Sequence, residues 1–141
     1  MTEAILVSNG PGELYTWVQP VLKELQSRNL KIKTTICLIP CQFAAGDETD
    51  IARTFGADSV SSPTEFINFL TTGRKPSAWS GENGFVISLG GSQAFALRLG
   101  RKLGYPTYRY HFIPSWHRDL KAIFVQDKPA ERQARLKGAP S

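Results

Sequence analysis

The chain has 141 residues, of which 41% are hydrophobic and 21% are charged, and its formal net charge is +5. This length and balance are typical of one globular domain and exclude an intrinsically disordered chain. No apolar run reaches the roughly 20 residues of a membrane-spanning helix. The first residues lack the basic region of a secretory signal, so no such signal is expected and a cytoplasmic location is expected. The Lys and Arg excess, much of it within 98–109 and 121–137, fits either an anionic partner or solvated helix faces.

Apolar runs and helical periodicities alternate along the first half of the chain. A buried strand is expected at Ala4–Ser8, followed by an amphipathic helix that ends near Asn29. Because Pro20 lacks an N–H group, this helix is expected either to kink or to begin at Trp17 with Thr16 as its N-cap. Further elements are expected at 31–39 (strand), 47–55 (helix), 58–60 (strand) and 62–73 (a helix opened by a capping box, S-P-T-E).

The second half repeats this alternation. The polar segment 74–83 is expected to be a loop that leaves Trp79 exposed. Phe85–Leu89 is expected to be a second buried strand, and Ser92 to cap a helix that Gly104 ends. Strands at 107–111 and 122–125 and a basic helix at 130–136 are expected to follow.

This order of elements predicts one α/β domain over residues 1–141. We expect a Rossmann-like, doubly wound, mostly parallel sheet of about six strands, in three α/β/α layers. Ligands bind such sheets beyond the carboxyl ends of the strands, so the loops after the two buried strands are the candidate site.

The first of these loops reads S-N-G-P-G-E. Asn9, Gly10 and Gly12 are expected to contact substrate, because glycine lets a backbone approach a ligand closely. Glu13 is expected to act as a general base or to bind a hydroxyl group at the start of the helix; the alternative is that it only complements the helix dipole. The spacing is neither a dinucleotide fingerprint nor a P-loop, and a tight turn that merely needs glycine is the alternative interpretation.

The second loop reads G-G-S-Q. Gly90, Gly91, Ser92 and Gln93 are expected to bind substrate, since Gln93 offers an amide donor and acceptor and Ser92 a hydroxyl. The alternative is that Ser92 is a plain N-cap.

The segment from His111 to Arg118 is aromatic and basic. His111 ends an expected strand at the ligand edge, so we expect either a catalytic group that titrates near neutral pH or a phosphate-binding group, or else a structural hydrogen bonder. Four aromatic residues are expected either to form an apolar lip that suits a membrane surface or to pack in the core: Tyr15, Trp17, Phe43 and Trp79.

No metal site is expected. Cys37 and Cys41 are the only cysteines, and no further Cys or His lies close to them in the sequence. Cys37 lies in an apolar run and is expected to be a small buried side chain.

Several strings resemble one known family, the lipid-A-disaccharide synthase-like proteins, over nearly the whole chain. They are I-L-V-S-N-G-P-G-E-L-Y-T-W-V-Q-P-V-L-K-E-L (5–25), G-G-S-Q-A-F (90–95), R-K-L-G-Y-P-T (101–107) and F-V-Q-D-K-P-A-E-R (124–132). The resemblance implies the N-terminal, acceptor-side domain of a GT-B glycosyltransferase. Such an inverting hexosyltransferase moves a sugar from a UDP-sugar, its donor substrate, to a glycolipid or other sugar acceptor, with no metal or other cofactor.

The resemblance also implies partners. The nucleotide-sugar-binding C-terminal domain would be missing from this chain, which would then be an incomplete catalyst alone. Peripheral contact with the cytoplasmic face of a membrane is expected, and nucleic acid binding is not. The family's synthases carry an aspartate, proposed as the catalytic base, in the loop after the fourth strand, where this chain reads G-G-S-Q.

Two other functions are compatible with the sequence. One is a free-standing domain that binds a nucleotide, a sugar or a membrane surface without catalysis. The other is a sugar-nucleotide epimerase-like domain of the same fold.

Overall fold

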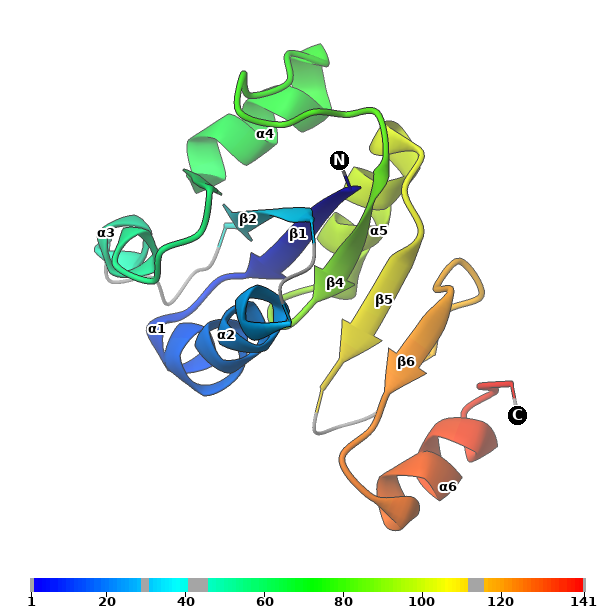
Figure 1. Cartoon of the computed structure of the whole chain (residues 1–141). Coiled ribbons are helices and arrows are strands. Elements are labelled where there is room, and N and C mark those ends of the chain that lie inside the picture. The colour runs from blue at the N-terminus through cyan, green and yellow to red at the C-terminus, as the bar shows by residue number, and fades with distance from the viewer. Residues whose placement is uncertain (1, 29–30, 41–45, 112–115, 141) are drawn as a thin grey trace.

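The computed structural model describes residues 2–28, 31–40, 46–111 and 116–140 (Figure 1). Its strands are β1 (Thr2–Ser8), β2 (Ile32–Leu38), β3 (Ser59–Ser61), β4 (Gly84–Ser88), β5 (Thr107–Tyr110) and β6 (Ala122–Phe124). Its helices are α1 (Pro11–Glu13), the π-helical turn η1 (Leu14–Val18), α2 (Gln19–Ser27), α3 (Glu48–Arg53), α4 (Pro63–Thr72), α5 (Gln93–Leu103) and α6 (Lys128–Leu136).

The strands form a six-stranded sheet in the order β3-β2-β1-β4-β5-β6, and every pairing is parallel. The chain winds outward from β1 to β3, then crosses to the other side of β1 and winds outward again from β4 to β6. This reversal confirms the predicted Rossmann-like, doubly wound fold. The point of reversal lies between β1 and β4, where Val7 is the register partner of Ser88.

Helices cover both faces of the sheet, as predicted. One core cluster joins Ile5 and Val7 to residues of α4 and α5, and the other joins Leu6 to residues of α2 and α3. Neighbouring residues of β1 point to opposite faces, which is why a strand buried on both sides is continuously apolar. Figure 1 shows α2 in front of the sheet, α5 behind it and α6 beyond β6.

The helix after β1 does not follow the alternative in which it begins at Trp17. It starts at Pro11, not at Trp17, and runs through the π turn η1 into α2. In this turn the N–H group of Gln19 bonds the carbonyl group of Leu14, five residues back. A regular α-helix would set the ring of Pro20 against the carbonyl group of Thr16, and the wider turn relieves that conflict without a break.

Trp79 was expected to be exposed, and this prediction is wrong. Its side chain is only 2% exposed, and its ring centroid lies 5.4 Å from that of Phe69 in α4. Segment 73–83 forms no helix or strand, as predicted, but it folds over the core between the sheet and α4. The Lys75 ammonium group holds this loop by donating hydrogen bonds to the carbonyl groups of Trp79 and Ser80, at 2.8 and 2.7 Å.

Predicted helix ends are largely confirmed. Ser62 and Glu65 form the reciprocal capping box of α4, with hydrogen bonds of 3.2 and 3.1 Å. Gly104 ends α5 in the left-handed conformation, at φ 73°.

β5 ends at Tyr110, so His111 belongs to the following loop and not to the strand. Among the described residues, no helix combines the length and apolar character that crossing a bilayer requires.

Candidate functional site

The loops after β1 and β4 meet at the carboxyl edge of the sheet. The N–H group of Leu89 donates a hydrogen bond of 2.8 Å to the carbonyl group of Val7, so the two strands leave the core side by side. Beyond this bond five residues form what we call the loop junction: Ser8, Asn9, Glu13, Gly90 and Gly91. The two glycine-rich loops, which were predicted separately from the sequence, are therefore in contact with each other.

Glu13 fills the centre of the loop junction. Its carboxylate accepts a hydrogen bond of 3.3 Å from the Ser8 hydroxyl. It also lies so close to Gly90 that a Cβ atom there would be 2.0 Å from Glu13 Oε2 and 2.9 Å from Ser8 Oγ. The side chain of Glu13 is half-buried, which leaves its carboxylate within reach of a ligand.

The glycines of the two loops differ in their surroundings. Gly91 has a φ of +73°, and a Cβ atom there would lie 2.5 Å from Ile39 Cδ1 and 2.9 Å from Asn9 Nδ2. Positions 90 and 91 therefore require glycine because a larger residue would collide with side chains of the same chain. At Gly10 and Gly12 a Cβ atom would meet nothing within 4 Å, so these two positions border open space.

Ser92 and Gln93 begin the helix on the far side of the junction. The Ser92 hydroxyl accepts a hydrogen bond of 3.3 Å from the N–H group of Ala94, which makes Ser92 the N-cap of α5. Gln93 Oε1 is buried and has no hydrogen-bond partner among the described residues. Ser92 therefore has the structural role of an N-cap, which was the alternative interpretation. The side-chain oxygen of Gln93 could still accept a hydrogen bond from a ligand.

His111 lies at the same edge of the sheet but packs elsewhere. Its ring is 5.5 Å from the Trp17 ring, in an edge-to-face arrangement, and Trp17 makes a similar contact of 5.8 Å with Tyr110. No described contact joins His111 to Glu13. The two predicted catalytic residues are therefore on one edge without forming one cluster.

Sequence reasoning missed Arg109, which counted there only as part of the basic excess. Its side chain is 8% exposed, and its Nη1 donates a hydrogen bond of 3.1 Å to Ser88 Oγ. Burial lowers the pKa of Arg109, and the negative charge of Glu13 opposes that effect. The sequence did contain one signal for a buried Arg109: it is a charged residue at an inward-facing position of a strand, and both of its neighbours in the sequence are aromatic.

A largely apolar groove of about 370 Å³ begins where the loop junction ends. We call it the apolar groove; it is lined by Thr16, Trp17, Pro20, Val21, Ile87, Leu89, Tyr110 and Phe124. Leu89 directly precedes Gly90, so the groove adjoins the junction. Phe124 is 52% exposed on this face of the sheet. None of the described helices covers strands β5 and β6 there as α2 covers β1 (Figure 1).

The predicted aromatic lip forms only in part. Trp17 lines the apolar groove, Trp79 lies in the core, and Tyr15 is 54% exposed and contacts Phe55. Phe43 lies outside the described residues, as do positions 112–115 of the aromatic and basic segment.

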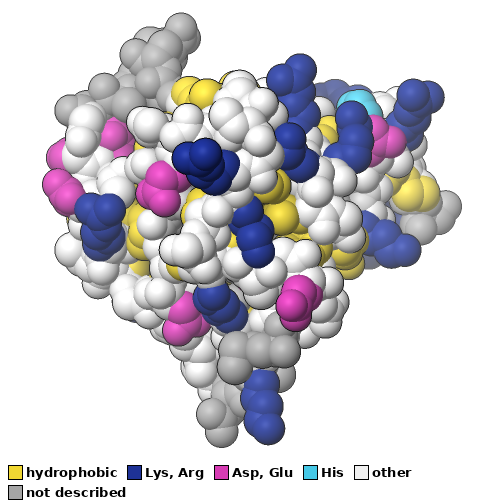
Figure 2. Space-filling view, turned by 90° about the horizontal axis from the view of Figure 1, so that it is seen from above, with side chains coloured by type: hydrophobic (Ala, Val, Ile, Leu, Met, Phe, Trp, Pro, Cys, Tyr) yellow, Lys and Arg dark blue, Asp and Glu magenta, His cyan; other side chains and the backbone are white. Residues whose placement is uncertain are grey.

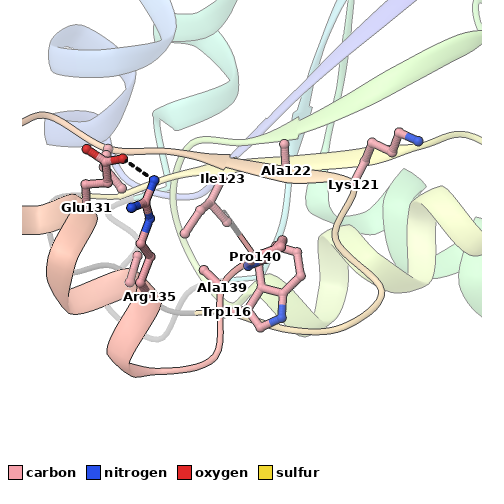
Figure 3. Close-up of a pocket in the computed structure, with 10 residues that line it drawn as sticks. Trp116, Lys121, Ala122, Ile123, Glu131, Arg135, Ala139 and Pro140 are labelled. Atoms are coloured by element: carbon pink, nitrogen blue, oxygen red, sulfur yellow. Dashed lines mark hydrogen bonds and ion pairs between the residues drawn. The ribbon is translucent and has the colours of Figure 1, made fainter.

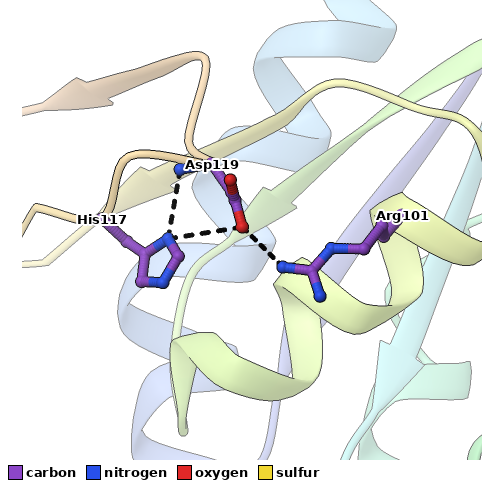
Figure 4. Close-up of polar contacts among 3 residues, drawn as sticks. All are labelled: Arg101, His117 and Asp119. Carbon is purple, nitrogen blue, oxygen red and sulfur yellow. Dashed lines mark hydrogen bonds and ion pairs between the residues drawn. The ribbon is translucent and has the colours of Figure 1, made fainter.

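The end of that segment lies away from the carboxyl edge. Trp116 lines a cavity of about 340 Å³ with Lys121 and Ala122, at the beginning of β6, together with Arg135 of α6 (Figure 3). The neighbouring His117 accepts a hydrogen bond of 3.1 Å at Nδ1 from the N–H group of Asp119 (Figure 4). Asp119 in turn pairs with Arg101 at 2.5 Å, so these contacts brace the turn before β6.

On the face shown in Figure 2, Lys and Arg side chains are spread over the surface without forming one continuous patch, and several of them lie near the His side chain. In the described ranges, no group of three or more His, Cys, Asp or Glu residues is placed to hold a metal ion.

Fold and site together define a Rossmann-like α/β protein with a carboxylate at the reversal point of its sheet and a buried guanidinium on the nearby strand β5. Comparison with models of protein families, with curated proteins and with solved structures found no match.

Proposed function

We propose that this chain is the acceptor-side domain of a glycosyltransferase similar to lipid-A-disaccharide synthases, with Glu13 as the base that activates the acceptor hydroxyl. One observation carries this proposal: the Glu13 carboxylate lies against Gly90, in the loop where those synthases carry an aspartate. A carboxylate is thus supplied to the same loop from a different element of the fold.

The chemistry needs a proton acceptor beside the acceptor hydroxyl. When that oxygen attacks the anomeric carbon of the UDP-sugar, the bond from this carbon to the UDP oxygen breaks, and the proton moves to Glu13. General base catalysis of this kind contributes about 10²- to 10⁴-fold to a rate. The Ser8 hydroxyl orients the carboxylate, and the open space at Gly10 and Gly12 leaves room for the sugar ring.

The apolar groove supports a glycolipid acceptor. Its walls are apolar and aromatic, and it adjoins the loop junction through Leu89. A sugar at the junction would therefore have an apolar surface beside it for an attached hydrocarbon chain, whose burial stabilises binding by about 0.8 kcal/mol per CH₂ group. The donor would come from a second, nucleotide-binding domain, because transition-state stabilisation needs groups from both sides of the reacting bond.

The test compares ligand binding with turnover. By calorimetry, the isolated chain should bind acylated sugars and should bind UDP weakly or not at all. Joined to a nucleotide-sugar-binding domain, it should transfer sugar from a UDP-sugar, and Glu13→Gln should lower kcat by about 10²-fold or more. The exposed Glu82→Gln variant is the matched control. Tight UDP binding or robust turnover by the isolated chain would contradict the proposed division of labour.

A further inference from the structure

A buried guanidinium lies at the carboxyl ends of β4 and β5. Arg109 is 8% exposed and is the register partner of Ser88, whose hydroxyl accepts its hydrogen bond of 3.1 Å. Ser88 is also the register partner of Val7 in β1 and stands two positions before Gly90. The guanidinium is therefore at the same edge of the sheet as the loop junction, on the α5 side.

This cation lacks the partners that a buried guanidinium normally has. Its Nε has no hydrogen-bond partner in the described part of the chain. None of the ion pairs within 4.0 Å that the described residues form includes Arg109. Glu13 acts on it electrostatically but does not reach ion-pair distance. A buried charge with a single neutral hydrogen bond opposes folding, so packing alone gives no reason for an arginine here.

We propose that Arg109 binds one oxyanion of a ligand, a phosphate or a carboxylate group, at the loop junction. A guanidinium presents five N–H donors in a planar fork that matches two oxygens of such a group, and Ser88 uses only one of them. Glu13 and Arg109 then take opposite parts of one ligand, a hydroxyl group and an anionic group.

The burial of Arg109 also restricts the kind of ligand. A flat bilayer or a nucleic acid backbone cannot reach the guanidinium of a residue that is 8% exposed, so the proposed ligand is a small molecule. The inference depends on the proposed function in one respect only, that the loop junction binds a ligand; it does not require sugar transfer.

The experiment follows the Nε–H resonance of Arg109 in the ¹⁵N-labelled chain. Potassium phosphate is added against potassium chloride at constant ionic strength, and acetate is added in a parallel series. We expect a saturable shift of this resonance with phosphate, with acetate or with both, and the more effective anion identifies the source of the oxyanion. Absence of a saturable shift in both series overturns the proposal. This test uses the natural chain, so it does not depend on whether a variant folds.

Variants separate ligand binding from a structural role. Arg109→Lys should weaken anion binding by at least about 30-fold, because it leaves a point charge in place of the fork. Arg109→Met should lose the anion-dependent rise in Tm and, without anion, should melt at or above the Tm of the natural chain. A lower Tm of Arg109→Met without anion, together with no anion response of the natural chain, would make Arg109 a packing residue. The exposed Arg98→Lys variant is the matched control and should respond to anions like the natural chain.

The outcome is distinguishable from that of the proposed function. Anion binding without any sugar transfer would support the oxyanion site and count against glycosyl transfer. Sugar transfer with unchanged Arg109 resonances would count against the oxyanion site alone.

Discussion

The Tyr105 hydroxyl donates a hydrogen bond of 3.0 Å to the carboxylate of Glu3, although the two residues are 102 positions apart in the sequence. Glu3 is completely buried near the amino end of β1, and its carboxylate also accepts bonds from the backbone and hydroxyl groups of Ser80, each at 3.2 Å. These bonds connect β1, the loop that carries Trp79 and the turn before β5. The amino end of the sheet is therefore held together by one buried carboxylate, away from the loop junction at the other end.

Replacing Tyr105 by Phe should destabilise the fold by about 1–3 kcal/mol, because a buried carboxylate loses a donor that water does not replace. The free energy of unfolding is measured by urea denaturation. Tyr15→Phe is the matched control: Tyr15 is 54% exposed, and its ring contact with Phe55 does not need the hydroxyl. Equal stabilities for the two variants would show that the bond to Glu3 contributes nothing.

The same pair gives a pH dependence. Burial is the main reason that the pKa of Tyr105 lies above its ordinary value of 10.0; the hydrogen bond with Ser80 lowers it, and Glu3 raises it. Because the neutral phenol is favoured in the folded state, its contribution to stability is complete below pH 10.0 and is lost as the pH rises through the folded-state pKa.

The difference in unfolding free energy between the natural chain and Tyr105→Phe should therefore shrink above pH 10.0. Taking this difference cancels other groups that titrate in the same range. If this difference stays constant or grows up to the highest pH at which the chain remains folded, the pKa of Tyr105 is not raised in the folded state.

Gly90→Ala should be more costly while Glu13 is present than when it is removed. The added Cβ atom would lie 2.0 Å from Glu13 Oε2, so the carboxylate must leave its place. In a double-mutant cycle with Glu13→Ala, we expect a coupling energy of about 0.5–3 kcal/mol, with Gly90→Ala better tolerated when the carboxylate is absent.

Gly12→Ala is the control for this cycle. A Cβ atom at Gly12 meets nothing within 4 Å, so the change should be neutral or should stabilise the helix by up to about 1 kcal/mol. If Gly90→Ala behaves in the same way, the carboxylate does not lie against Gly90.

Cys37 should be unreactive in the folded chain. Burial raises the pKa of its thiol to about 12, with the neighbouring Ser61 side chain acting in the opposite direction. At neutral pH the thiolate fraction is then about a thousandfold smaller than at the ordinary pKa of 9.0. In a Cys41→Ser background, which leaves one thiol, labelling by an aromatic disulfide reagent should proceed only as fast as the chain unfolds. Rapid labelling of the folded chain, independent of stabilising salts, would contradict this.

Local chemistry made much of the fold predictable. The capping box at Ser62, the cap at Ser92 and the stop at Gly104 each depend on residues within one turn, so the sequence contains the whole interaction. The buried strands are predictable for a similar reason, because burial on both faces requires a continuous apolar run. The order of these elements was then enough to predict a parallel, doubly wound sheet.

The candidate site was predictable only in its loops. Asn9, Glu13, Gly90 and Gly91 could be assigned to one sheet edge, since parallel strands end on the same side. Their contact depends on β1 and β4 being neighbours, and the burial of Arg109 depends on the pairing of β4 with β5. No local pattern records these pairings.

The sequence by itself determined which segments are strands and helices, where most helices end, and that glycine-rich loops follow the two buried strands, because those properties arise from short-range sterics and hydrogen bonds. Only the tertiary structure decided that Trp79 is in the core, that Glu3 holds the amino end of the sheet, and that Glu13 and Arg109 lie at one edge. Burial and electrostatic pairing are properties of three-dimensional neighbours, and these residues become neighbours only when the strands assemble in the observed order.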